Sequence, residues 1–300
     1  MHLQRHHILR FLVIFGAYFV TGFAGLQLQY HGTSQSMVWL PPGIALGTMI
    51  LWGWRYFPAV FLGSILTTIF SGIPVLPALL IGVTSTISVT ISAAIIGRFF
   101  KDNLLSSLRG LIAFFLIGVF AAPVTAAFLG SGLVFLNGMP EAANFNELWL
   151  SWTLSSMVGV LIAAPLILRV VNYPWQSRST ANYLELIFIA IAAVIVSSTV
   201  HTTPITSRPE YLFIFVSLPF VIWSAIRFGM MGTTLVNGLI AITIVGFTAA
   251  GLGGFVNVNA KDGIREIHSY ILIVSFISIL MAAGFEKIGN ITTRARDGKI

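Results

Sequence analysis

Ten apolar runs, joined by short connections, dominate this sequence and restrict it to a membrane. They cover residues 8–28, 39–54, 57–70, 75–97, 108–136, 147–169, 183–200, 211–226, 229–249 and 268–286. About 20 apolar residues in a helix cross the hydrocarbon layer of a bilayer, which is ~30 Å thick. The pattern predicts an all-α, polytopic membrane helix bundle with about ten transmembrane helices. The second and third runs are short, as are the junctions at Arg55 and Arg227, so a count of eight stays open.

The charge content agrees with a lipid environment. Charged residues make up only 8% of the chain, whereas soluble domains carry about 25%. The net charge of +7 raises the question of nucleic-acid binding. However, the basic residues stand singly at the ends of apolar runs, which is typical of membrane orientation and not of a phosphate-binding face. We therefore expect the lipid bilayer as a partner and no nucleic acid.

The distribution of basic residues predicts the topology. With a cytoplasmic N-terminus and ten spans, thirteen of the sixteen Lys and Arg residues fall inside and three fall outside. The three outer bases are Arg208, Lys261 and Arg265. Cytoplasmic loops of membrane proteins carry the excess of Lys and Arg, so this division favours an N-in/C-in arrangement. One integral membrane domain, residues 1–288, is expected.

A pair of prolines interrupts the chain at the start of the second run. Proline disfavours a helix in the residue before it and suits the first helical turn, so this helix should begin near Pro42 and end near Trp54. Such a helix is only about 20 Å long, and the third run is similarly short. Irregular backbone at membrane depth is tolerated where it is buried in protein or lines a wet cavity. We therefore predict that residues 37–42 and 70–74 line a shallow cavity open to the outside.

The predicted cavity supplies most of the candidate ligand-binding residues. Trp39, Pro41 and Pro42 would shape one wall. The sixth run begins on the same side with acidic and aromatic residues, and we expect Glu147, Trp149 and Trp152 on the facing lip. The open alternative is that Trp39 belongs to an interfacial aromatic belt and that the prolines form only a turn.

Several short motifs resemble those of a known family. Residues 39–45 read WLPPGIA and residues 53–58 read GWRYFP, which include Gly43, Gly53, Arg55 and Pro58. Further along, the helix with Trp149 and Trp152 runs to Gly159 and Pro165, and residues 223–229 read WSAIRFG, which include Trp223, Arg227 and Gly229. In this order the motifs resemble the membrane-associated sensor domain of the first type, the MASE family, over nearly the whole chain.

The resemblance implies a location and a function class. Members of that family are multi-pass input domains of the bacterial inner membrane, with about eight to ten helices. They usually precede a histidine kinase, a GGDEF diguanylate cyclase or PAS modules. The resemblance therefore implies signal transduction, with two-component or cyclic di-GMP signalling downstream. It assigns no chemical role to individual residues.

The chain ends at Ile300, soon after the last run. We expect residues 289–300 to be a cytoplasmic tail or the start of a linker, helical only marginally because of Gly289. The output module would then act in cis if the chain is truncated, or in trans if it stands alone. The stimulus, a small molecule or a protein, is not identified by the sequence, and a homodimer is left open.

Catalytic and metal-binding patterns are not found. The sequence lacks a Walker loop, a nucleophile elbow and an H-E-x-x-H motif, so we expect no enzyme activity, cofactor or metal. The histidines at 31, 201 and 268 fall at the outer ends of runs and are expected to be solvated. Asn237 is the one deeply placed amide and is a ligand-binding candidate, with a packing hydrogen bond as its alternative.

Two readings of function therefore remain. In the first, the chain is a sensory input domain that relays an outer or intramembrane stimulus through its last helix. In the second, it is a secondary transporter of a small solute, since a broken helix is a feature of transporters. The lack of an ionisable residue at mid-membrane depth disfavours transport.

Overall fold

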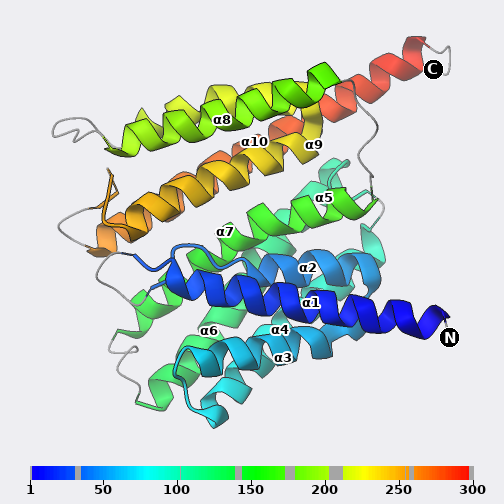
Figure 1. Cartoon of the computed structure of the whole chain (residues 1–300). Helices are drawn as coiled ribbons and strands as arrows, with labels where there is room; N and C mark the ends of the chain where they lie inside the picture. Colours follow the sequence, from blue (N-terminus) through cyan, green and yellow to red (C-terminus); the bar gives the residue numbers. More distant parts are fainter. Residues whose placement is uncertain are drawn as a thin grey trace.

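The computed structural model describes residues 2–30, 35–101, 103–138, 144–172, 180–202, 212–253, 255–256 and 260–296. Over these residues the chain is a bundle of helices, and one isolated bridge pairs Gln29 with Ser36. The prediction of an all-α bundle is confirmed. Both chain ends lie at the same end of the bundle (Figure 1), here called the terminal end, and the opposite end is called the distal end.

The helices follow the apolar runs closely. Their bounds are α1 His2–Gln27, α2 Pro41–Trp52, α3 Phe57–Phe70, α4 Val75–Phe99, α5 Leu108–Ala113, α6 Ala122–Leu136, α7 Phe145–Asn172, α8 Thr180–Thr202, α9 Leu212–Ala249 and α10 Ala260–Arg296. A short 3₁₀ turn, Trp54–Tyr56, joins α2 to α3, and a π-helical segment, Phe114–Ala121, joins α5 to α6.

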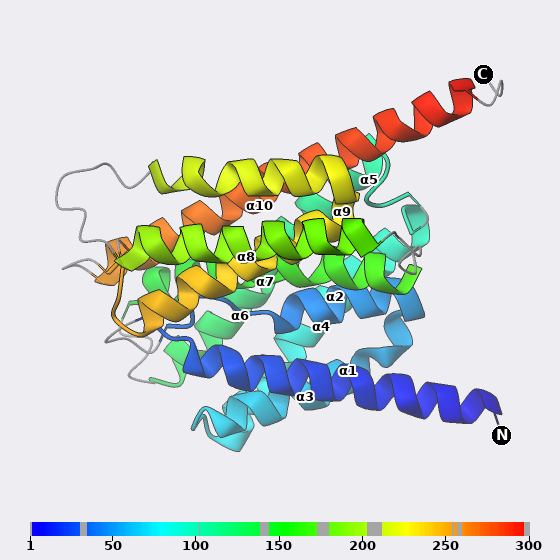
Figure 2. The same cartoon turned by 45° about the horizontal axis from the view of Figure 1, so that its top comes forward.

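Seven of the described helices are long and apolar enough to cross a membrane. One of them is α9, in which Gly229 has the non-helical angles φ 62° and ψ −152° and divides the element in two. Figure 2 shows α9 doubling back, so that it begins and ends at the distal end. Helix α2, with 12 residues, is shorter. Each of the ten predicted runs is thus helical, while the number of membrane crossings stays a prediction.

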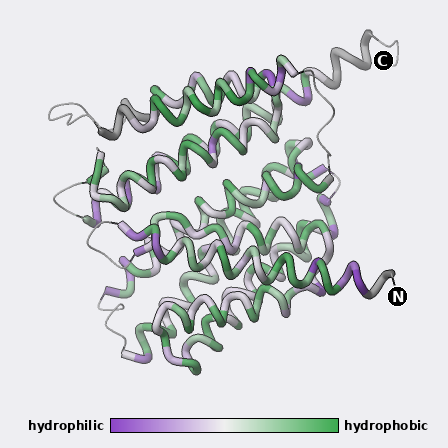
Figure 3. The backbone as a smooth tube through the Cα atoms, viewed as in Figure 1, coloured by the Kyte–Doolittle hydropathy of each residue, from purple (hydrophilic) through white to green (hydrophobic). Residues whose placement is uncertain are grey.

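Hydropathy follows the pattern of a membrane protein. Apolar residues cover the helices along most of their length, and hydrophilic residues gather toward the two ends of the bundle (Figure 3). Large apolar side chains also point outward, including Leu116, Phe188 and Ile226, each more than half exposed. A soluble monomer rarely exposes so much contiguous apolar surface, whereas lipid-facing helices require it.

The fifth run is helical along its length, with an irregular segment in its middle. Pro123 has no N–H to donate to the carbonyl four residues earlier, and its ring clashes with that carbonyl. The helix accommodates this with the π-helical segment Phe114–Ala121 directly before Pro123. Such π-helical turns are rare, and together with proline they are among the features at which helices bend.

Helix α7 occupies the centre of the bundle. Its Val160 and Leu161 belong to a core formed mainly with α1–α6, while its Val158 and Ile162 belong to a second core formed with α8–α10. Among the helices of spanning length it has the largest buried share. Because α7 packs on both halves, it is the element best placed to connect them.

Two expectations about the start of α10 need correction. The helix begins at Ala260, eight residues before the predicted start, and His268 is fully buried where a solvated histidine was expected. The helix also continues past Gly289 to Arg296 and projects beyond the other helices at the terminal end (Figure 1). Packing against α9 and α7 stabilises the first extension, which local propensity alone does not reveal.

Candidate functional site

A cavity of about 260 Å³ opens at the distal end, between the ends of α1, α3, α4, α6 and α7. Two tryptophans, Trp39 and Trp152, line it together with apolar side chains such as Ile81 and Val134. The remaining lining is polar and uncharged and consists of Gln29, Gln35, Ser36, Thr67, Thr68, Ser71, Ser151 and Ser155. Short helices α2 and α3 leave this space, in the region where the sequence predicted a cavity.

The segment between α1 and α2 forms one wall of the cavity and is fixed from three sides. The N–H of Tyr30 donates to the carbonyl of Gln35 at 2.9 Å, and the Tyr30 hydroxyl donates to the carbonyl of Phe255 at 2.5 Å. The N–H of Trp39 donates to the carbonyl of Ser155 in α7 at 3.1 Å. Residues 35–40 of this connection are called the strap. Its backbone hydrogen bonds explain why irregular chain is tolerated inside the bundle.

The strap also contacts α10. The imidazole Nε2 of His268 lies 2.9 Å from the carbonyl oxygen of Met37, and both residues are fully buried. Met37 stands between two cavity-lining residues, Ser36 and Trp39. A displacement of the strap would therefore change its contact with His268 of α10.

Glycines provide the space that the two tryptophans fill. A Cβ at Gly25 would lie 3.0 Å from Cε3 of Trp39, and a Cβ at Gly130 would lie 2.8 Å from Cη2 of Trp152. Each indole is thus held with its six-membered ring against helix backbone. The positions of the two aromatic walls are consequently defined by packing, which is what a preformed site needs.

The other residues predicted for the cavity are placed around it. Pro42 lines a water-sized cavity of about 20 Å³ that shares Trp39 and Trp152 with the larger one, and Pro41 lines neither. Both prolines lie in the first turn of α2, close to the predicted start.

Of the residues predicted for the lip of α7, Trp152 lines the cavity, whereas Glu147, Trp149 and the candidate amide Asn237 do not. Glu147 forms an ion pair of 2.5 Å with Lys261 of α10, beside Gln35 and Ser151. Trp149 packs on Phe128 and Phe145 and donates from Nε1 to the carbonyl of Val124 at 3.4 Å. Asn237 donates to Ser275 Oγ at 2.8 Å, inside the α9–α10 interface.

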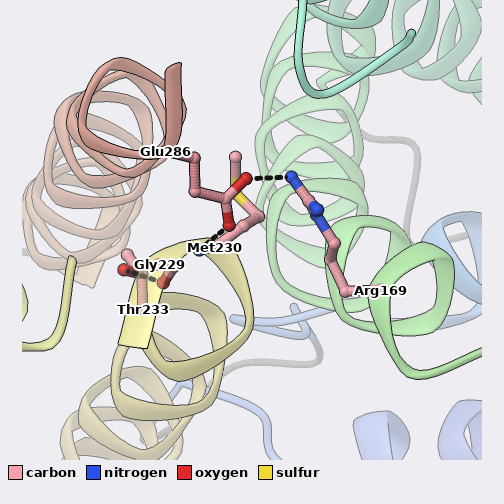
Figure 4. A network of polar contacts seen from close by, with 5 residues as sticks. All are labelled: Arg169, Gly229, Met230, Thr233 and Glu286. Atoms are coloured by element: carbon pink, nitrogen blue, oxygen red, sulfur yellow. Dashed lines mark hydrogen bonds and ion pairs between the residues drawn. The ribbon is translucent and has the colours of Figure 1, made fainter. Parts of the chain in front are cut away.

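A second polar cluster lies at the terminal end, where α7, α9 and α10 meet (Figure 4). One carboxylate oxygen of Glu286 pairs with the guanidinium of Arg169, and the other accepts the N–H of Met230 at 2.7 Å. Met230 follows the turn at Gly229, so its N–H is one of the unsatisfied donors at a helix start. Thr233 Oγ1 donates to the carbonyl of Gly229 at 2.7 Å and closes the turn. We call this cluster the Glu286 clasp.

Comparison with known families decides what kind of domain this is. The family model described as MASE1 matches residues 9–287, which is nearly the whole chain. This chain belongs to the MASE1 family. No curated protein and no solved structure matches it. MASE1 domains are membrane sensory input domains of signalling proteins, so the chain is a multi-pass membrane sensor domain.

The motifs that resembled the family have clear structural roles in this MASE1 domain. A Cβ at Gly159 of α7 would overlap the carbonyl oxygen of Trp39, and a Cβ at Gly43 of α2 would overlap the carbonyl oxygen of Gly159. The two glycines therefore allow the backbones of α2, α7 and the strap to touch. Pro165 lies within α7, further along the same helix.

The turn between α2 and α3 is built from the second motif. Gly53, with φ 100°, ends α2, and Pro58 opens α3 in its first turn. Arg55 between them is exposed, whereas Tyr56 is buried and its hydroxyl lies 2.7 Å from Nδ1 of His7.

In the later motif, Trp223 and Arg227 stand four residues apart on one face of α9 and share one partner. Both bind Glu185 of α8: the indole N–H at 2.9 Å, and the guanidinium through two bonds of 2.8 and 2.7 Å. The motif thus joins α8 to α9 directly before the turn at Gly229.

Neither the strap–α10 contact nor the Glu286 clasp was predicted from the sequence. Their partners are far apart in the chain: Met37 and His268, and Arg169 and Glu286. The one available indication was that Glu147, Glu185 and Glu286 all lie near helix ends. In the structure each of these three acids is paired with a base.

Proposed function

We propose that this domain receives its stimulus in the distal cavity and relays it through α10 to a cytoplasmic output, a histidine kinase or a diguanylate cyclase. The output would be joined to the chain or would act as a separate partner in the bacterial inner membrane. In this arrangement the distal end faces outward and α10 leaves the bilayer on the cytoplasmic side, as the distribution of basic residues predicts.

The Glu286 clasp carries the proposal. Helix α7 lines the cavity with Ser151 and Ser155 at one end and holds Glu286 of α10 through Arg169 at the other. Ser155 and Arg169 are about 21 Å apart along the helix axis at 1.5 Å per residue. One continuous and mostly buried helix, with Pro165 between the two contacts, thus connects the cavity to the point where α10 leaves the bundle.

A second route to the same helix supports the proposal. The strap touches α7 through Trp39 and Ser155 and touches α10 through Met37 and His268. A ligand that repositions the strap would therefore act on α10 near its start, while α7 acts on it near its exit. Two restraints on one helix favour a small number of discrete positions for it, which is the requirement for a switch.

Output measurements with altered clasps test the relay. We would fuse a diguanylate cyclase after Ile300 and introduce Glu286→Gln, Arg169→Met, or both charges exchanged as Arg169→Glu with Glu286→Arg. Loss of one partner leaves the other charge partly buried and costs about 1–3 kcal/mol, which corresponds to a shift of roughly 5- to 150-fold in a two-state equilibrium. We expect both single variants to change basal cyclic di-GMP output by at least about fivefold, and the exchange to restore part of it.

The matched control is Glu185→Gln. It removes an ion pair between α8 and α9 that also lies beside the turn in α9 but does not involve α10. This variant should leave output unchanged. The relay would be refuted if both clasp variants kept wild-type output in fusions that remained inserted and folded.

A further inference from the structure

The cavity lining defines the charge of its ligand. Among the described residues, the side chains that line it are tryptophan, amide, hydroxyl or aliphatic, with none that ionises. The nearest charged groups, Glu147 and Lys261, are paired with each other at 2.5 Å beside Gln35 and Ser151. Burying an ion without a partner costs free energy. A charged ligand would lose its hydration in this cavity and would find no opposite charge to compensate for that loss.

The hydroxyl groups of the lining define the polarity of its ligand. The single protons of Thr67, Thr68 and Ser71 are donated to the carbonyls of Gly63, Ser64 and Thr68 at 2.7–2.8 Å. Ser36 and Ser155 likewise donate to backbone carbonyls. Each of these five hydroxyl oxygens therefore offers only acceptor lone pairs to the cavity. A complementary ligand must carry several O–H or N–H donors.

The remaining walls define its shape. Trp39 and Trp152 provide flat apolar surfaces whose positions are fixed by Gly25 and Gly130. A volume of about 260 Å³ corresponds to roughly nine water molecules at ~30 Å³ each. The occupant is thus a small molecule with one apolar face and several hydrogen-bond donors on the other.

We infer that the distal cavity binds an uncharged, polyhydroxylated small molecule of the size of a monosaccharide. The inference deepens the proposed function and rests on it only for the consequence of binding. The binding itself is a property of the cavity and is measured without any output module.

The chain has no cysteine, which makes single-cysteine protection a direct assay. Ser71→Cys and Ser151→Cys place one thiol each in the cavity, and Asn137→Cys places one on the exposed end of α6 outside it. The purified, full-length domain would be labelled with a small uncharged maleimide. The competitors are glucose and myo-inositol, their charged counterparts glucuronate and glucosamine, and cyclohexanol, which keeps the ring and loses all but one hydroxyl.

A neutral polyol should slow labelling of both cavity thiols about tenfold at ~10 mM, where a millimolar site is nearly saturated. Glucuronate, glucosamine and cyclohexanol should protect severalfold less, and Asn137→Cys should react at the same rate throughout. Thr68→Val, which removes one acceptor, should weaken protection of a cavity thiol. Thr84→Val removes a similar hydroxyl-to-carbonyl bond outside the cavity and should not.

Two results would overturn the inference: a charged competitor protecting as well as its neutral counterpart, or neither neutral polyol protecting either thiol. The proposed function fails separately. If polyols protect the thiols but the clasp variants leave cyclase output unchanged, the ligand class stands and the relay does not. If the clasp variants change output while no polyol protects, the relay stands and the ligand class is wrong.

Discussion

At the scale of single residues, the most demanding positions are glycines at which backbones meet. Gly159 of α7 faces the carbonyl of Trp39, and Gly43 of α2 faces the carbonyl of Gly159. Small residues spaced four apart, Gly43 and Gly47 on α2, allow this close approach, as in many membrane helix pairs. The strap, which forms a wall of the cavity, therefore depends on the absence of a single methyl group.

The substitution Gly159→Ala tests this dependence. In an open helix, alanine is more favourable than glycine by about 0.8–1 kcal/mol. At Gly159 the new Cβ would overlap backbone that cannot rotate away, and overpacking costs about 1–3 kcal/mol or more. We expect a lower thermal unfolding midpoint for the purified domain. Gly132→Ala in α6, where nothing lies within 4 Å of the added Cβ, should be neutral or stabilising. Equal behaviour of the two variants would contradict the close contact.

The sequence indicated which residues are notable, but it did not indicate which residues they contact. Gly43 and Gly159 stood out as parts of motifs, and Glu286 as an acid at a helix end. Nothing local indicates that Gly43 meets Gly159, or that Glu286 meets Arg169, because these pairs arise only when distant helices pack. The burial of His268 has the same origin: its partner, the carbonyl of Met37, comes from the strap.

At the scale of elements, prolines and glycines allowed the bounds of several helices to be predicted from the sequence. The prolines at 41 and 42 set the start of α2 within one residue, and the shortness of α2 and α3 indicated where a cavity forms. Gly229 divides α9 at the junction between two predicted runs. By contrast, the π-helical segment before Pro123 and the early start of α10 depend on packing with neighbours, which periodicity does not describe.

The turn in α9 makes an element-scale prediction. The angles of Gly229, φ 62° and ψ −152°, lie in a region that is essentially restricted to glycine, and other residues there pay about 1–3 kcal/mol. A Cβ would also lie 2.5 Å from Oε1 of Glu286. Gly229→Ala should therefore lower the unfolding midpoint and loosen the Glu286 clasp together.

A double-mutant cycle separates these two effects. If Gly229→Ala and Glu286→Gln disturb the same contact, their costs in unfolding free energy should be less than additive. Gly246→Ala, in the second half of α9 with open space around it, serves as the control and should not couple to Glu286→Gln. Full additivity of Gly229→Ala with Glu286→Gln would argue against a shared contact.

At the scale of the whole molecule, α7 and the strap link a distal cavity to a helix that leaves the opposite end. The strap contacts α7 and α10 near the cavity, and the Glu286 clasp joins the same two helices at the terminal end. Helix α10 then continues to Arg296 (Figure 2). A change in the cavity can thus reach α10 without unfolding any element, by moving helices that already touch.

The proposed direction of signalling requires the distal end to face outward, and the cysteine-free chain allows that orientation to be measured. Asn144 lies directly before α7, at the distal end, and Asn103 lies between α4 and α5, at the terminal end (Figure 1). Thirteen of sixteen basic residues favour a cytoplasmic terminal end. In intact cells, Asn144→Cys should react with a membrane-impermeant thiol reagent, and Asn103→Cys should react only after permeabilisation. Labelling of both positions from the same side would rule out this fold in the membrane, and reversed labelling would place the cavity in the cytoplasm, where the proposed direction of signalling could not hold.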